Sequence, residues 1–457
     1  MVQFIVEISK YLIIVLIAIY TLLCFVIFGV NSTEKQKGML KNQNVVMFLF
    51  HLVAFIVLYL EKEMDIKIFG FYLMQILFFI IVLLAYTKLY PQVSRLVLNN
   101  MCMLLCIGFV ILTRLKYELA LKQFIFASAG VVLSLIVPII IRKFKSLAKL
   151  RIVYGVVGII SLGVVAVAGR TQYGAKLGFN IAGINIQPSE LVKIVFVFFV
   201  ASCFVYSLEF KDIVITTGIA ALHVLILVAS KDLGAALIIF IVYITMLYVA
   251  TKQPLYLFAG MGAGAIASYF AYRIFSHVQV RVNAWRDPMA TYETGGYQVA
   301  QSLFAIGTGS WIGRGLMQGD PKLIPVAESD FVFSAIAEEL GLVFAICLIL
   351  ICISVYIMFL NIAMELRNGF YRLVALGLGT CYIFQVFLTV GGVTKFIPST
   401  GVTLPLISYG GSSLLSTLIM FAIIQGLYIV REDEEEDIEQ KKRERLKRNV
   451  KKRAKRI

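Results

Sequence analysis

Charged residues are scarce in this 457-residue sequence, in which Asp, Glu, Lys and Arg together make up only 15%. A soluble globular domain has about a quarter of its residues charged, so this composition argues against a water-soluble fold. Histidine occurs only three times, at scattered positions, and the seven cysteines match no zinc or redox spacing. We therefore expect no metal site, and we expect the cysteines to pack as small apolar side chains.

Long apolar runs take the place of the missing charge, because 60% of the residues are hydrophobic. A helix needs about 20 mostly apolar residues to cross a bilayer, and the sequence lacks the short alternating segments of a transmembrane β-barrel. We predict an all-α, polytopic transmembrane helical bundle. Its expected helices are residues 8–30, 46–61, 68–88, 99–115, 122–141, 152–168, 189–208, 212–229, 233–250, 255–276, 331–360, 372–392 and 407–430.

The Lys and Arg residues of the short connections predict how these helices are oriented. Basic residues cluster in the segments 35–41, 88–95, 142–151 and 367–372 and in the C-terminal tail, all on one side of the expected bundle. Two turns on the other side, at 62–67 and 116–122, carry two Lys residues each and run more weakly against the trend. We expect a multi-pass membrane protein with its N-terminus outside and its C-terminus in the cytoplasm.

The last segment, residues 432–457, is a charged tail. An acidic run at 432–439 precedes residues 441–456, which hold eleven Lys and Arg against one Glu and account for most of the net charge of +16. Such a tail is compatible with nucleic acid, but contact with anionic lipid at the cytoplasmic face is the interpretation we prefer. We expect this solvated segment to have no regular structure and the protein to have no nucleic-acid partner.

A few charged residues lie where an expected helix meets one membrane face, and each needs a reason because charge in the bilayer is costly. Glu190 and Lys193 are three residues apart on one helix face, which suits either a structural ion pair or the wall of a polar cavity. Asp232 precedes a helix and suits either an N-terminal cap or the same cavity. We expect Glu338 and Glu339 to serve in helix packing or to line the cavity.

Three connections on that side, 169–188, 277–330 and 393–406, are longer or more polar than simple turns require. The middle connection is the longest by far, and long ordered loops on a rigid scaffold often carry function. It holds Arg281, Arg286 and Arg314, which suit phosphate binding, and several carboxylates. Its glycines follow no phosphate-loop pattern, so we interpret them as turns and close backbone approaches.

Five motifs in this region resemble those of the SEDS family of bacterial cell-wall polymerases, which comprises the FtsW, RodA and SpoVE proteins. The most specific is Gly401-Val-Thr-Leu-Pro-Leu-Ile-Ser-Tyr-Gly-Gly-Ser412. The other motifs are Ile186-Gln-Pro-Ser-Glu-Leu-Val-Lys193, Asp232-Leu-Gly-Ala, Trp285-Arg-Asp-Pro288 with Gly296-Tyr-Gln and Gln301-Ser-Leu, and Ser329-Asp-Phe-Val-Phe333 with Ala337-Glu-Glu-Leu-Gly341.

The resemblance implies a catalytic core of ten transmembrane helices at residues 98–431, preceded by about three extra helices at 1–97. It implies a peptidoglycan glycosyltransferase that polymerises lipid II at the outer face of the bacterial cell membrane, for division, elongation or sporulation. A class B penicillin-binding protein, which is a transpeptidase, is the implied partner. We expect no cofactor; a divalent cation is compatible with this chemistry but cannot be derived from the sequence.

Asp287 corresponds to the essential acid of the family, although an Asp before Pro is by itself a common way to begin a turn. Direct displacement of a sugar pyrophosphate requires a base for the acceptor hydroxyl and positive charge near the leaving group. We therefore expect Asp287 to be catalytic. The expected substrate-binding residues are Glu190, Lys193, Asp232, Arg281, Arg286, Lys395 and Ser412.

The chain departs from the family pattern at a few positions. Lys231 precedes Asp232 where the family commonly has Pro, Lys176-Leu-Gly178 follows Gly174-Ala175, and Ala327-Glu-Ser329 replaces a Pro-Glu sequence. Two other functions remain compatible with a polar cavity in the membrane: a transporter that flips a lipid-linked precursor, and a scaffold without catalytic activity. Only the glycosyltransferase requires Asp287 for chemistry.

Overall fold

The computed structural model describes residues 2–144, 146–172, 175–181 and 184–454. Thirteen helical segments within these residues are long and apolar enough to span a membrane, and the helical bundle predicted from the sequence is confirmed. One segment, Tyr117–Lys143, consists of two helices, and two further helices are short, so sixteen α-helices are named here. The helices are α1 Val2–Val26, α2 Thr33–Glu61, α3 Ile66–Leu89, α4 Arg95–Leu115, α5 Tyr117–Ser134, α6 Val137–Lys143, α7 Arg151–Ala168, α8 Pro188–Tyr206, α9 Phe210–Ala229, α10 Leu233–Thr251, α11 Pro254–Ile274, α12 Ser276–Arg286, α13 Tyr297–Gly309, α14 Val332–Glu365, α15 Gly369–Val393 and α16 Gly411–Ala454.

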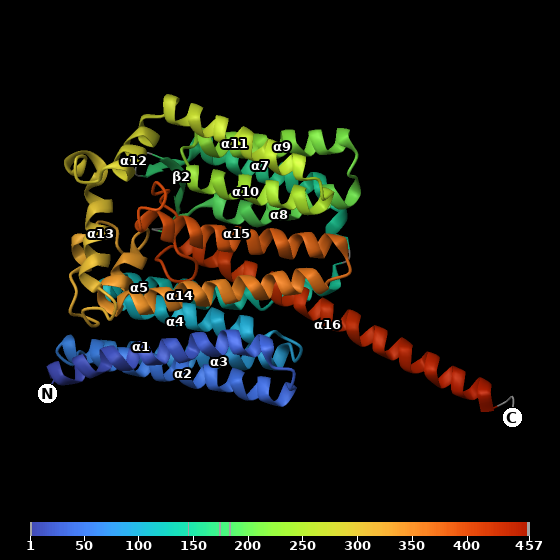
Figure 1. Cartoon of the computed structure of the whole chain (residues 1–457), viewed down its shortest axis with the longest axis horizontal. Helices are drawn as coiled ribbons and strands as arrows, with labels where there is room; N and C mark the ends of the chain where they lie inside the picture. Colours follow the sequence, from blue (N-terminus) through green and yellow to red (C-terminus); the bar gives the residue numbers. More distant parts are fainter. Residues whose placement is uncertain (1, 145, 173–174, 182–183, 455–457) are drawn as a thin grey trace.

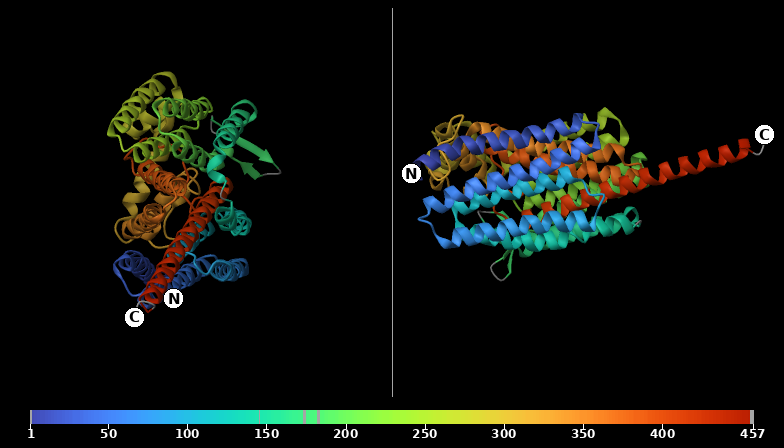
Figure 2. Two further views of the ribbon diagram at one scale, coloured as in Figure 1. Left: turned by 90° about the vertical axis from the view of Figure 1, so that its right-hand side faces the viewer. Right: turned by 90° about the horizontal axis from the view of Figure 1, so that it is seen from below.

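The long helices lie side by side and define two ends of the molecule (Figure 1). The short helices α12 and α13 lie at one end, which we call the cavity end for the site described below. At the opposite end, which we call the tail end, α16 continues beyond the bundle, as the right-hand view of Figure 2 also shows. The first three helices form a separate layer along one side.

Helix α4 is the structural centre between that layer and the other helices. The apolar stretch of this helix is entirely buried, and the helix packs against α2, α5 and α14. Asn100 of α4 accepts hydrogen bonds from the Tyr20 hydroxyl at 3.1 Å and from the Cys24 thiol at 3.2 Å. Its amide donates to Ser354 of α14 at 3.4 Å. Buried hydrogen bonds thus join α1, α4 and α14 inside the apolar region.

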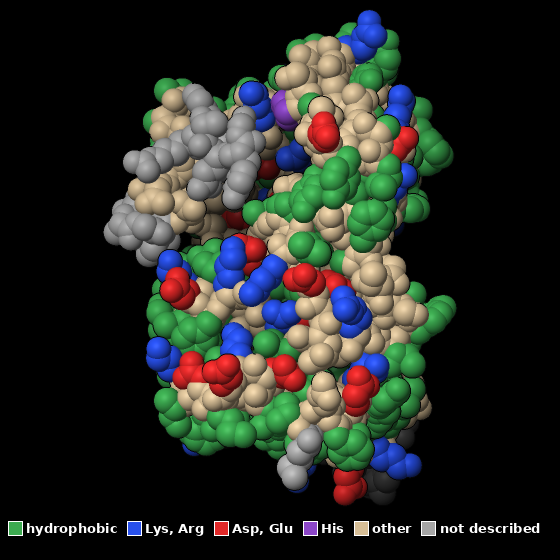
Figure 3. All heavy atoms as spheres, turned by 90° about the vertical axis from the view of Figure 1, so that its left-hand side faces the viewer, with side chains coloured by type: hydrophobic (Ala, Val, Ile, Leu, Met, Phe, Trp, Pro, Cys, Tyr) green, Lys and Arg blue, Asp and Glu red, His purple; other side chains and the backbone are tan. Residues whose placement is uncertain are grey.

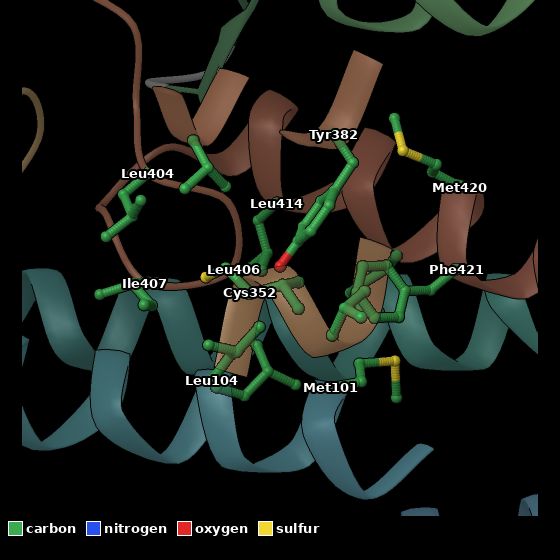
Figure 4. Close-up of a cluster of buried hydrophobic side chains, with 14 of the residues drawn as sticks. Met101, Leu104, Cys352, Tyr382, Leu404, Leu406, Ile407, Leu414, Met420 and Phe421 are labelled. Carbon is green, nitrogen blue, oxygen red and sulfur yellow. The ribbon is translucent and has the colours of Figure 1, made fainter. Parts of the chain in front are cut away.

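The segment before α16 returns into the bundle and packs among apolar side chains (Figure 4). Leu404, Leu406 and Ile407 of this segment are buried beside α4. A Cβ atom at Gly108 of α4 would come within 2.9 Å of the Leu406 carbonyl oxygen and 3.0 Å of Ile407 Cα. The absence of a side chain at Gly108 therefore allows this segment to lie close to the helix backbone.

The connections at the cavity end contain more structure than we expected. Residues 277–330, which we expected as one long connection, include α12, a short π-helix at Tyr292–Gly296 and α13. The connection after α7 forms three antiparallel strands, β1 Arg170–Gln172, β2 Ala175–Ile181 and β3 Ile184–Ile186, in the order β1-β2-β3. Residues 173–174 and 182–183 lie outside the described residues. They include Gly174, which precedes one of the departures from the family pattern.

The charged tail is helical, in contrast to our expectation of no regular structure. Helix α16 continues through the acidic run and into the basic run as far as Ala454, and residues 455–457 lie outside the described residues. Ion pairs help to explain the continuation, because Arg142 contacts Asp433 through two hydrogen bonds of 2.7 and 2.9 Å. Arg431 pairs with Glu365 of α14 and with Glu432. These contacts neutralise part of the acidic run where it leaves the bundle.

Candidate functional site

A cavity of about 1320 Å³ opens at the end of the bundle where α12 and α13 lie. Figure 3 looks at this end and shows a central hollow bordered by Lys, Arg, Asp and Glu side chains. The basic residues that line the cavity are Lys116, Lys122, Lys193, Lys231 and Arg281, and the acidic ones are Glu118, Glu190, Asp232, Glu328 and Asp330. This mixed charge suits a polar substrate that carries both hydroxyl and anionic groups.

Glu190 and Lys193 form an ion pair in the wall of this cavity. The Lys193 ammonium lies 2.9 Å from the Glu190 carboxylate and donates to the side chain of Gln385 of α15 at 2.8 Å. The second carboxylate contact comes from the Ser416 hydroxyl of α16, at 3.1 Å. Both charged side chains are buried. The sequence left open a structural ion pair or a cavity wall, and the structure combines the two. The ion pair contacts side chains of neighbouring helices, and it also lines the cavity.

Asp232 likewise has a structural role and lines the cavity. Its carboxylate caps α10 by accepting from the Ala235 amide at 3.1 Å, and it accepts from the Ser189 hydroxyl at 2.9 Å. Burial raises the pKa of this carboxyl above its ordinary value, and the two hydrogen bonds oppose the shift. The hydrogen bond from Ser189 joins the start of α8 to the start of α10. The first turns of both helices line the cavity.

Arg281 reaches the cavity from α12 and attaches that helix to the connection before α16. Its guanidinium donates to the Ser399 carbonyl at 3.0 Å. The Trp285 indole, one turn further along α12, donates to the Lys395 carbonyl at 3.1 Å. Gly401 has φ +71, and a Cβ there would lie 3.5 Å from the Arg281 guanidinium, so glycine lets the backbone pass close to this side chain.

Asp330 is a cavity residue that the sequence did not identify by itself, although it lies within the quoted Ser329-Asp-Phe motif. Burial raises the pKa of its carboxyl, while a hydrogen bond from Ser329 and the charge of Arg281 act in the opposite direction. A Cβ at Gly401 would lie 3.3 Å from one carboxylate oxygen. The signal that could have identified Asp330 is its position at the start of a membrane span, beside the long connection.

Ser412 also lines the cavity and lies at the start of α16. Its hydroxyl accepts from the Gln187 amide at 2.9 Å and donates to the Asn185 carbonyl at 3.1 Å. The hydroxyl therefore fastens the connection between β3 and α8 to the first turn of α16. Gln298 of α13 is a further lining residue, which we had noted only as part of a motif.

Three residues expected to act on the substrate, Asp287, Arg286 and Lys395, are not among the described residues that line the cavity. Asp287 and Arg286 are exposed at the end of α12. The Asp287 carboxylate accepts from the amides of Met289 at 3.1 Å and Ala290 at 2.9 Å, so the turn suggested by the Asp-Pro sequence does form. Their roles toward the substrate remain predictions.

Glu338 and Glu339 hold the connection between α13 and α14 in place. One Glu339 oxygen lies 2.7 Å from the Arg114 guanidinium and accepts from the Gly319 amide at 3.3 Å, and the other accepts from the Met317 amide at 3.2 Å. Glu338 accepts from the Asp320 amide at 2.9 Å. The two carboxylates therefore act in packing at the cavity end, and they do not belong to the cavity lining described above.

No group of three or more His, Cys, Asp or Glu side chains that could hold a metal ion occurs among the described residues. The lining of the cavity offers carboxylates, ammonium and guanidinium groups, hydroxyls and amides. Such groups can bind an anion, orient sugar hydroxyls and accept a proton.

Comparison with known proteins places this site in a wider context. Residues 94–432 match the sequence model of a family described as FtsW, RodA and SpoVE, cell cycle protein. A peptidoglycan glycosyltransferase RodA from Mycobacterium bovis is 33% identical over 370 residues, which are 75% of this chain and 79% of that protein. A probable peptidoglycan glycosyltransferase FtsW from Geobacter metallireducens is 35% identical over 274 residues, covering 56% of this chain and 70% of its own length.

Solved structures share the fold. A chain of a peptidoglycan synthase complex, whose structure concerns the coordination of polymerisation and crosslinking, superposes with a TM-score of 0.64 at 24% identity. The match covers 74% of this chain and 98% of that one. The rod shape determining protein RodA of Thermus thermophilus superposes with a TM-score of 0.57 at 23% identity, over 74% of this chain and 96% of that one.

Proposed function

Because this chain belongs to the FtsW, RodA and SpoVE family of cell cycle proteins, it is a membrane-embedded peptidoglycan glycosyltransferase, and we propose that it polymerises lipid II. Lipid II is a disaccharide-pentapeptide joined to undecaprenyl pyrophosphate. The observation that carries the proposal is the cavity of about 1320 Å³ at one end of the bundle, with five basic and five acidic residues in its lining. Its walls offer partners for sugar hydroxyls and for a pyrophosphate, while the surrounding helices suit the lipid chain.

We further propose that the cavity faces the outside of the cell. The tail end carries the basic residues of the short connections and the basic run of α16, whereas the cavity end has as many acidic as basic residues in its lining. An excess of Lys and Arg in short connections marks the cytoplasmic side. This orientation gives an external N-terminus and a cytoplasmic C-terminus, and the substrate is then polymerised on the outer face.

The proposed reaction is a direct displacement at the anomeric carbon of the growing glycan. The acceptor 4-hydroxyl of an incoming lipid II loses its proton to a base, its oxygen bonds to that carbon, and the bond to the pyrophosphate oxygen breaks. Undecaprenyl pyrophosphate leaves with both bonding electrons, so positive charge near it lowers the barrier. We assign the base to Asp287, which ends the same helix that carries Arg281 into the cavity.

The test is glycan polymerisation from purified lipid II by the full chain in detergent, comparing wild type with Asp287→Asn. Asp65→Asn is the matched control, because Asp65 is also an exposed residue whose carboxylate accepts from a backbone amide two positions on, at 2.9 Å. We expect polymer from wild type and from the control, and a loss of about a hundredfold or more in the Asp287→Asn variant.

Other outcomes assign other functions. Equal polymer from wild type and Asp287→Asn would remove Asp287 from the mechanism and direct the search for a base to the cavity acids. No polymer from folded wild type, with or without a transpeptidase, would favour the scaffold or the transporter. Movement of a labelled lipid-linked precursor across liposomes that contain the protein would then identify the transporter.

We also propose that the partner is a class B penicillin-binding protein and that residues 1–97 are an addition to a catalytic core at 98–431, followed by the tail at 432–457. One solved relative by fold belongs to a peptidoglycan synthase complex, which supports the partner. Co-purification with a candidate transpeptidase and faster polymerisation in its presence test this pairing. A candidate that neither binds nor accelerates the reaction is not the partner.

A further inference from the structure

The basic side chains of the cavity differ in how far their charge is already neutralised. Lys193 is paired with Glu190 at 2.9 Å, and Lys116 is paired with Glu328 at 2.6 Å. An ammonium group held by a carboxylate offers little net charge to an incoming anion. These two lysines therefore contribute to the shape and polarity of the cavity more than to its capacity for binding anions.

Arg281 is also partly neutralised, although it forms no close ion pair with a described residue. Its guanidinium donates to the Ser399 carbonyl at 3.0 Å. Burial lowers its pKa, and the negative charges of Asp330 and Asp232 raise it. Two carboxylates therefore balance this guanidinium, and one of its donors is already used to hold the connection before α16.

Lys122 and Lys231 are different, because both are exposed side chains in the cavity lining and neither forms an ion pair with a described residue. Lys122 lies in the second turn of α5, and Lys231 lies in the turn between α9 and α10. Figures 1 and 2 place α5 on the side of α4 and α14, and α10 on the opposite side of α15. The two lysines that line the cavity therefore belong to elements on different sides of the bundle.

The backbone holds Lys231 in place. Its φ is +63, a left-handed conformation, and its amide donates to the Val228 carbonyl at 3.0 Å. Burial, followed by the positive charges of Lys231 and Arg281, lowers the pKa of His277, so both charges act on this histidine. The His277 Nε2 atom is buried without a hydrogen-bond partner in the structure. Lys231 is also the residue that departs from the family pattern before Asp232.

We propose that Lys122 and Lys231 form the anion-binding pair of the cavity and hold the pyrophosphate of the lipid-linked substrate from two sides. This inference rests on the proposed function and refines it, because it assigns recognition of the pyrophosphate to two lysines instead of to the arginines of the long connection. An ammonium group without a carboxylate partner binds phosphate oxygens by charge-assisted hydrogen bonds and supplies positive charge where the leaving group departs.

Binding of undecaprenyl pyrophosphate to the purified full chain in detergent tests the proposal, with undecaprenol as the uncharged lipid of the same length. We expect wild type to prefer the pyrophosphate, and Lys122→Gln/Lys231→Gln to weaken its binding by about tenfold or more while leaving undecaprenol unaffected. Lys231→Arg, which keeps the charge, should retain most of the affinity.

Lys252→Gln is the matched control, because Lys252 follows the other end of α10 and is also left-handed, with φ +56, but does not belong to the cavity lining. It should bind as wild type does. Thermal unfolding of each variant establishes that it is folded. Wild-type affinity in the double variant would overturn the proposal, as would an equal loss in Lys252→Gln or no preference of wild type for the pyrophosphate.

Polymerisation measured on the same samples separates the two proposals. Polymer from wild type together with unchanged binding by the double variant would reject this pair and leave the glycosyltransferase assignment standing. Weaker pyrophosphate binding by the double variant, together with no polymer from wild type, would support the pair and count against the proposed activity.

Discussion

Arg114 of α4 and Glu339 of α14 form a buried ion pair, with 2.7 Å between the guanidinium Nε and a carboxylate oxygen. Their side chains are only 8% and 1% exposed. Arg114 also donates to the Gly319 carbonyl at 2.9 Å, so the pair connects two helices to the segment that follows α13. Removal of either partner leaves the other charge buried without compensation.

The first prediction concerns this pair. We expect Arg114→Met to lower the stability of the folded protein by about 3–5 kcal/mol, because an unpaired Glu339 carboxylate stays buried. The double variant Arg114→Met/Glu339→Gln should recover part of the loss. Unfolding in detergent measures both. Arg142→Met is the control, because it breaks an ion pair whose partners are 54% and 30% exposed. It should lower the stability by less than about 1 kcal/mol. Equal losses of stability in Arg114→Met and Arg142→Met would contradict this prediction.

A second prediction follows from the close approach of α4 to residues 404–407. Gly108→Ala places a methyl group about 3 Å from the Leu406 and Ile407 backbone atoms, and backbone moves aside less readily than a flexible side chain. We expect a loss of about 1–3 kcal/mol. Gly163→Ala in α7 has no atom within 4 Å of the added Cβ and should be neutral or stabilising by up to about 1 kcal/mol. Thermal unfolding of the two variants gives the comparison.

The hydrogen bonds of Asn100 lead to a third prediction. Asn100→Leu removes the partners of Tyr20, Cys24 and Ser354 inside the apolar region. Interhelical hydrogen bonds of membrane proteins contribute about 0.6 kcal/mol on average and up to about 2 kcal/mol. We expect the variant to unfold at a lower temperature and to release α1–α3 earlier, as measured by hydrogen exchange in those helices. Tyr20→Phe, which removes a single bond, should have the smaller effect.

Asp330 gives a prediction about pH. The unfolded chain loses this proton near the ordinary value of 3.8, whereas burial raises the pKa in the folded protein. Between the pKa of the unfolded chain and the higher pKa of the folded protein, the folded state binds more protons than the unfolded state. This carboxyl group therefore makes the free energy of unfolding fall as pH rises. Asp330→Asn removes the effect, and its unfolding temperature relative to wild type should rise from about pH 4 to about pH 7. A difference that stays constant or falls over this range contradicts the predicted direction.

The sequence predicted the helices well because a bilayer demands about 20 apolar residues for each span, and this demand leaves a strong signal. It also identified Glu190, Lys193 and Asp232 as charged residues near a membrane face, and the structure brings all three into one cavity. Arg281 and Ser412 join them. Arg281 was expected from its charge in the long connection, whereas the resemblance alone supplied Ser412, whose local pattern does not distinguish it from a surface residue.

The same reasoning could not separate residues that line the cavity from residues that lie beside it. Arg286 and Lys395 carry the right charge in the right connections, but their positions depend on how α12 is rotated and on where the segment before α16 turns. Those features are set by tertiary contacts such as the Trp285 indole donating to the Lys395 carbonyl at 3.1 Å. The sequence did not identify Lys122 and Lys231 as binding residues for the corresponding reason: Lys122 was one basic residue of a short turn, and Lys231 was only a departure from the family pattern.

Helix α16 runs without interruption from Gly411, beside the cavity, to Ala454 in the charged tail. Its 44 residues correspond to about 66 Å at 1.5 Å per residue. Ser416, near its start, donates to Glu190 at 3.1 Å. One continuous helix therefore reaches from the cavity wall at one end of the bundle to the charged tail beyond the other end, with no loop between them.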